Sequence, residues 1–150
     1  MANKAIIYCR VATTFPVSSN KALDYQADVC KRYAQNKGYL VVKVIQERGS
    51  GSKINLGLQS AIKEIKSGKA NILIATEPSK LTRKYSDFFV IKDELGQKLE
   101  FLSNAGCNNP DERDLRDCLS MGLSEFYQRK ISERMRKVAI ETRHTRTARS

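Results

Sequence analysis

The chain has 150 residues, of which 41% are hydrophobic and 29% are charged, and its formal net charge is +11. This length suits one domain whose core needs no disulfide or structural metal. The longest apolar runs are too short to cross a bilayer, and the first residues lack the pattern of a secretory leader. We therefore expect a cytoplasmic protein without a membrane contact, and the charge favours a polyanionic partner.

The cysteine and histidine pattern does not favour a metal site. The cysteines at positions 9, 30, 107 and 118 form no C-x-x-C pair, and the histidine, His144, lies in a basic tail away from them. Cys9 and Cys118 fall in segments of apolar periodicity, which is typical of small buried side chains in a reducing compartment. We expect neither a metal ion nor a cofactor.

The first half of the chain predicts two strands around a helix. Residues 5–9 are almost wholly apolar, as in a strand covered on both faces. Residues 39–45 are β-branched and apolar and indicate a second strand, and the polar residues 47–55 predict a long loop. The helix predicted between them, over 22–37, has its periodic face at Ala22, Tyr25, Gln26, Val29, Cys30 and Tyr33.

The pattern continues with alternating helices and strands. Residues 58–68 and 87–96 predict helices that end at glycine, and residues 72–75 and 99–102 predict short strands. Strands that alternate with helices of this length imply right-handed crossovers. We therefore expect a three-layer α/β/α domain over residues 1–110 with a mostly parallel central sheet.

A long helix is predicted from about Asp111 to about Thr142, with residues 111–150 forming a second unit. At ~1.5 Å per residue it would be ~48 Å long, more than a small domain can cover. The helix either lies across its own sheet or packs on a second copy, and we favour a homodimer or higher oligomer through residues 111–142. Its apolar residues keep helical spacing: Leu115, Leu119, Leu123, Phe126, Ile131, Met135 and Val138.

The end of this helix is strongly basic. From position 129 onward, eight Lys and Arg oppose two Glu, which gives this segment a charge of +6. A cationic helix end is suited to the phosphates of DNA, although a solvated charged face is the alternative. The DNA contacts that we expect are Arg134, Arg136, Lys137, Arg143 and Arg146.

Six short strings follow one another along nearly the whole chain: Tyr8 to Thr13, Leu23 to Gln26, Gly49 to Gly51, Gly57 to Gln59, Pro78 to Arg83, and Ser124 to Arg134. In this order they resemble the catalytic domain shared by transposon resolvases, DNA invertases and large serine integrases. The corresponding family patterns are Y-x-R-V-S-T, L-D-x-Q, the glycine loop after the second strand, the start of the next helix, L-D-R-L-S-R, and A-E-F-E to I-S-E-R of the long helix.

The resemblance to serine recombinases implies a metal-free reaction. A serine hydroxyl attacks a DNA phosphodiester and forms a 5′-phosphoserine link with release of a 3′-hydroxyl. Clustered arginines stabilise the charge on the phosphoryl oxygens. The catalytic positions carried over to this chain are Arg10, Ala12 (the nucleophile position), Ser50, Ser79, Lys80 and Arg83.

Several of these positions depart from the family pattern. Ala12 has no atom that can attack, and Ser79-Lys80 replaces an aspartate-arginine pair. Asn55 stands where the family has an arginine, and Tyr127 where it has a glutamate. Arg10 and Arg83 either still bind a phosphate or are surface or ion-pair residues. Thr13 and Thr14 follow Ala12, but moving the attacking oxygen by one residue along the loop already shifts it by up to ~3.8 Å, which disfavours attack by either threonine.

These departures leave several functions open. The leading interpretation is a noncatalytic recombinase homologue that binds DNA and pairs through its long helix. Because the family's separate DNA-reading domain is not found before Ser150, we expect contacts mainly to phosphates and weak site specificity. The alternatives are an active site-specific recombinase with an unorthodox nucleophile, an interaction protein that regulates an active recombinase by mixed dimerisation, and an α/β domain without a DNA role.

Overall fold

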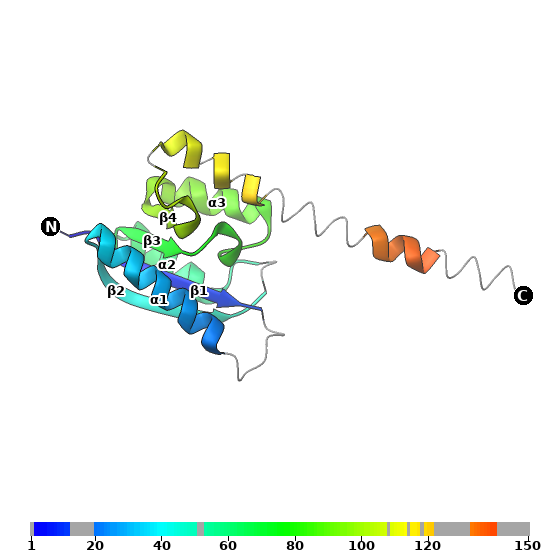
Figure 1. Cartoon of the computed structure of the whole chain (residues 1–150), viewed down its shortest axis with the longest axis horizontal. Coiled ribbons are helices and arrows are strands. Elements are labelled where there is room, and N and C mark those ends of the chain that lie inside the picture. Colours follow the sequence, from blue (N-terminus) through cyan, green and yellow to red (C-terminus); the bar gives the residue numbers. More distant parts are fainter. Residues whose placement is uncertain are drawn as a thin grey trace, which may run out of the picture.

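A computed structural model describes residues 2–12, 20–50, 53–107, 109–113, 115–117, 119–121 and 133–140. In this part, strands and helices alternate along the chain as the hydrophobic periodicity predicts (Figure 1). Short 3-10 turns lie between some of them. In order, the elements are β1 (Lys4–Val11), α1 (Asn20–Lys37), β2 (Leu40–Arg48), α2 (Leu56–Lys66), β3 (Ile72–Ala75), η1 (Pro78–Lys80), α3 (Tyr85–Leu95), η2 (Gly96–Lys98), β4 (Leu99–Phe101) and η3 (Leu102–Asn104).

The strands form a parallel sheet in the order β2-β1-β3-β4. β1 pairs with β2 as far as Val11, but it pairs with β3 only as far as Ile7. The last residues of β1 therefore extend beyond β3, where their backbone groups need other partners. The predicted parallel α/β fold is confirmed.

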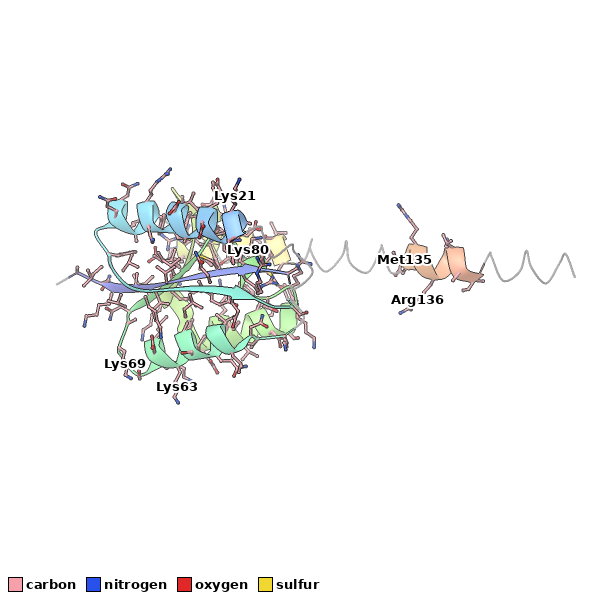
Figure 2. The ribbon with its side chains drawn as sticks, turned by 90° about the horizontal axis from the view of Figure 1, so that it is seen from below. Lys21, Lys63, Lys69, Lys80, Met135 and Arg136 are labelled. Carbon is pink, nitrogen blue, oxygen red and sulfur yellow. The ribbon has the colours of Figure 1, made fainter. Side chains whose placement is uncertain are left out.

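Helices cover both faces of the sheet, and the core is accordingly divided in two. Figure 2 shows α1 on one side of the sheet and α2 on the other. Because successive side chains of a strand point to opposite faces, Ile6 and Tyr8 pack with α2 and α3, while Ile7 and Cys9 pack with α1. Burial on both faces explains why β1 reads as a continuous apolar run.

Two predictions about this part of the chain were wrong in detail. Glu47 and Arg48 belong to β2 rather than to the following loop, because they pair with the end of β1. Tyr25, which we placed on the packed face of the first helix, is 69% exposed. The buried face carries the predicted Gln26 and Cys30 together with Leu23, Ala27 and Ala34, which the prediction left out.

The predicted long helix is only partly within the described residues. The described residues between 110 and 121 are helical, and so are residues 133–140. Asp117 and Met121, one turn apart, pack against the domain, whereas Leu115 and Leu119 are 59% and 58% exposed. Leu123, Phe126 and Ile131 lie outside the described residues, so dimerisation through this helix and the division at residue 110 stay predictions.

None of the helices in the described ranges combines the length and the apolar character that crossing a membrane requires.

Candidate functional site

The predicted site residues gather where the parallel strands end, which is the usual place for ligands in such sheets. Arg10 and Ala12 come from the end of β1, Ser50 follows β2, and Ser79 and Lys80 form η1 after β3. Figure 2 shows Lys80 at the end of the domain towards which β1 runs. The fold therefore brings together residues that are up to 70 positions apart in the sequence.

Arg10 is the centre of this arrangement, and its side chain is turned inward. Its Nη1 donates to the carbonyl oxygen of Gly49 at 2.9 Å, its Nη2 to Ser79 at 2.7 Å, and its Nε to Lys80 at 3.0 Å. Arg10 is only 3% exposed, and this burial is the main cause that lowers its pKa. The guanidinium therefore ties the loops after β2 and β3 to the end of β1.

Gln26 of α1 supplies the backbone partner that β1 lacks beyond β3. Its Oε1 accepts from the backbone N–H of Arg10 at 3.1 Å, and its Nε2 donates to the carbonyl of Arg10 at 3.2 Å. A side-chain amide has one donor and one acceptor side, so it can replace a neighbouring strand. The glutamine of the Leu23 to Gln26 string thus has a structural role, which the sequence comparison with the family did not reveal.

Glu47 links the core of the sheet to α2. Its Oε1 accepts from the hydroxyl of Tyr8 at 2.6 Å, and its Oε2 accepts from the backbone N–H of Gly57 at 2.8 Å. Burial, followed by this bond to Glu47, raises the pKa of Tyr8 above its ordinary value. A Cβ at Gly57, the second residue of α2, would lie 2.8 Å from Glu47 Oε2, so the glycine gives the carboxylate room to cap the helix in this position.

Asn55 holds the loop between β2 and α2. It is buried, with 6% exposed, and its Nδ2 donates to the carbonyl of Ser50 at 2.9 Å. A Cβ on Gly49 would lie 2.4 Å from Asn55 Oδ1, so the glycine permits this close approach. The side chain at the position of the family's arginine is therefore used for internal packing rather than held at the surface.

Ser79 and Lys80 share one carboxylate partner. The Ser79 hydroxyl donates to Glu77 Oε1 at 3.0 Å, and Lys80 Nζ lies 3.9 Å from the same oxygen. Arg83 is exposed, and its charge is close enough to lower the pKa of Arg10 after the larger effect of burial. Three cations thus surround a site in which Glu77 is a carboxylate that sequence reasoning missed.

Ala12 follows the last residue of β1 and is partly buried. It lies two residues after Arg10 at the end of β1 and offers only a methyl group. Thr13 and Thr14, the alternative hydroxyls, lie outside the described residues.

The predicted DNA-contacting residues are divided between described and undescribed parts. Arg134, Arg136 and Lys137 lie on residues 133–140, all of which are exposed, and Figure 2 shows Arg136 on this helical segment. Arg143 and Arg146 lie outside the described residues, as does Tyr127.

A buried polar cluster that the sequence did not predict attaches the described helical residues between 110 and 121 to the domain. Asp117 is 5% exposed, and its Oδ1 accepts from Asn104 Nδ2 at 2.7 Å. Its Oδ2 accepts from Lys92 Nζ at 3.1 Å. The sequence contained one signal for this contact. Asp117 shares a helix face with Met121 rather than with Leu115 and Leu119, which could have indicated that this face packs on the domain.

Within the described ranges, no three His, Cys, Asp or Glu side chains gather as metal ligands.

The parallel sheet has helices on both faces and cations beyond the ends of its strands. The protein is therefore an α/β domain with a candidate anion site. The sequence profile of the family described as "Resolvase, N terminal domain" matches residues 5–146. The chain therefore belongs to the resolvase family of serine recombinases, as its local strings predicted.

A relative in Bacillus subtilis (strain 168), named "Putative DNA recombinase", is 30% identical over 132 residues. The alignment covers 85% of this chain and 26% of that protein, so the chain spans about a quarter of the relative's length.

Two solved structures share the fold. The N-terminal catalytic domain of TP901-1 integrase has a TM-score of 0.56 at 21% identity and covers 90% of this chain and 98% of its own. A resolvase family site-specific recombinase from Streptococcus pneumoniae has a TM-score of 0.60 at 17% identity, and the match covers 93% of this chain and 97% of that protein's chain. At these identities the similarity concerns the fold.

Proposed function

We propose that this chain is a noncatalytic serine-recombinase homologue that binds DNA and associates through its long helix. The proposal depends on two features found together at the end of β1: alanine at position 12, and an Arg10 side chain that is turned inward. The nucleophile position has no hydroxyl, and the neighbouring guanidinium is held by three carbonyl oxygens. Both changes act against phosphoryl transfer at this place.

The other substitutions support the same proposal. Phosphoryl transfer needs cations aimed at the phosphoryl oxygens, and arginine grips two oxygens where lysine provides a point charge. Here Lys80 stands in the place of such an arginine and lies near Glu77, while Asn55 is packed against Gly49. The site is therefore organised by bonds within the protein.

Incubation with supercoiled DNA tests for catalysis. We expect no covalent adduct between protein and DNA and no strand cleavage by the wild type. The Ala12→Ser variant should also remain inactive, because a restored hydroxyl leaves Asn55, Ser79 and Lys80 in place. An adduct mapped by mass spectrometry to Thr13 or Thr14 would instead identify an active recombinase with an unorthodox nucleophile.

Fluorescence anisotropy with a labelled duplex at several salt concentrations tests DNA binding. If four or five of the eight cations after position 128 contact phosphates, the slope of log K against log salt is about −3.6 to −4.5. Random duplex should bind nearly as well as any chosen sequence. Replacing Arg136, Lys137, Arg143 and Arg146 with Gln should flatten the slope, and an unchanged affinity would remove this segment as the DNA contact.

A second candidate function is regulation of an active recombinase through mixed dimers. It is favoured by the apolar side chains that the helical segments leave exposed, among them Leu119, Met135 and Val138. Co-expression with a catalytically active relative tests it. Co-purification of the two chains, abolished by Leu119→Glu, would support mixed dimers, whereas separate elution of the two proteins would exclude them.

A further inference from the structure

The Glu77 carboxylate is an anionic group within a site that holds three cations. Its Oε1 accepts from the Ser79 hydroxyl at 3.0 Å and lies 3.9 Å from Lys80 Nζ. These are a hydroxyl donor and a cation, the groups with which a protein holds a phosphate oxygen. The carboxylate therefore takes the place on Ser79 and Lys80 that an external anion would need.

The backbone beneath this pair is fixed by Arg10. Its guanidinium donates to the carbonyl oxygens of both Ser79 and Lys80, so the backbone of the two residues is held in place by the protein itself. Arg83 adds a further cation close by. A prearranged group of donors binds an anion at a lower entropic cost than flexible side chains do.

We propose that Glu77 is an internal competitor for a phosphate-binding position formed by Ser79 and Lys80, and that it sets the affinity of this position for phosphate groups. This inference rests on the proposed function for its DNA ligand but concerns a different contact from the basic helix end. When Glu77 keeps its charge, it both holds Lys80 and repels an approaching phosphate. When the charge is removed, this repulsion is lost and Lys80 becomes available to the ligand.

Glu77→Gln tests the proposal, because glutamine keeps the length and a carbonyl acceptor for Ser79. At ~5 Å in water, removal of one like charge favours an anion by about fourfold. Release of an exposed ion pair adds up to about fivefold. We therefore expect inorganic phosphate to bind about four- to twentyfold more tightly to the variant.

Glu94→Gln is the matched control. Glu94 is also exposed and lies 3.8 Å from a lysine, Lys66, on α3 and α2 away from the site. Both variants raise the net charge by one, so a general effect of charge would improve binding in both. The proposal requires the gain in Glu77→Gln alone.

The measurement is a titration of the whole chain with inorganic phosphate at low ionic strength, followed by the backbone amide signals of residues 79–83 in NMR spectra. The gain should disappear in the Glu77→Gln/Lys80→Gln double variant. No tightening in Glu77→Gln, an equal gain in Glu94→Gln, or a gain that persists in the double variant would each overturn the inference.

A short labelled duplex, titrated in parallel, distinguishes the source of the phosphate group. A gain for both ligands assigns the position to DNA, and a gain for inorganic phosphate alone assigns it to a free phosphate compound. Absence of duplex binding by the wild type would contradict the proposed function, while the phosphate titration would still test Glu77.

Discussion

Replacing Arg10 with Met separates a structural role of this arginine from a role in holding phosphate. The three guanidinium bonds end on carbonyl oxygens in a place where Arg10 is 3% exposed. At about 1–1.5 kcal/mol net for each of these bonds, one buried and two partly buried, their loss lowers the free energy of unfolding by about 3–5 kcal/mol. Because methionine keeps much of the apolar volume, this loss reports mainly on the polar contacts.

Thermal unfolding followed by circular dichroism provides the measurement. For a domain of this size a loss of 3 kcal/mol lowers Tm by about 6–12 °C. Arg83→Met is the control, since this exposed neighbour should change stability by no more than about 0.5 kcal/mol. If Arg10 instead served to bind a ligand among other cations, its replacement would leave the protein equally stable or more stable. An Arg10→Met variant as stable as the control would therefore refute the structural role.

Three further predictions concern the core and the helix. Gln26→Leu should lower the free energy of unfolding by about 2–3 kcal/mol in urea titrations, because a backbone amide and carbonyl at the end of β1 lose their partner. Burial raises the pKa of Cys9 to about 11 and of Cys30 to about 12, so both thiols should resist iodoacetamide at pH 8 until urea is added, as read by peptide mass spectrometry. Sedimentation should show self-association of the wild type that is lost in the Leu119→Glu variant. The control is Leu56→Glu, at a side chain on α2 that is 80% exposed, which should keep the self-association. A monomeric wild type would contradict the prediction.

The order of elements could be predicted because each one carries a local signal. Strands such as β1 and β3 are short apolar runs, and α2 has its buried residues at helical spacing. The ends of elements were less certain, since Glu47 looks like a loop residue until its pairing with β1 is known. Tyr25 shows the same limit for a helix face, where periodicity gives the spacing but packing decides the direction.

The resemblance predicts which residues meet beyond the ends of the strands, but it does not predict the direction of their side chains. An arginine that binds phosphate and one that binds backbone carbonyls look identical in a sequence, because the acceptors of Arg10 are main-chain atoms with no side-chain signature. Glu77 was missed for a related reason. It matters only because η1 turns its carboxylate towards Ser79 and Lys80.

The departures of the site from the family pattern are not independent of one another, because the residues concerned lie on loops that contact each other. In the usual reaction of the family, the guanidinium and the hydroxyl must both face the DNA. Under the proposed noncatalytic function, Ala12 has removed the hydroxyl and Arg10 no longer needs to stay available, so its bonds to Gly49, Ser79 and Lys80 can stabilise the fold instead. Residues freed from catalysis can then be used for stability, since active sites commonly trade one against the other. Glu77 fits this argument, because a carboxylate placed between Ser79 and Lys80 would hinder phosphoryl transfer but neutralises part of a site that holds three cations.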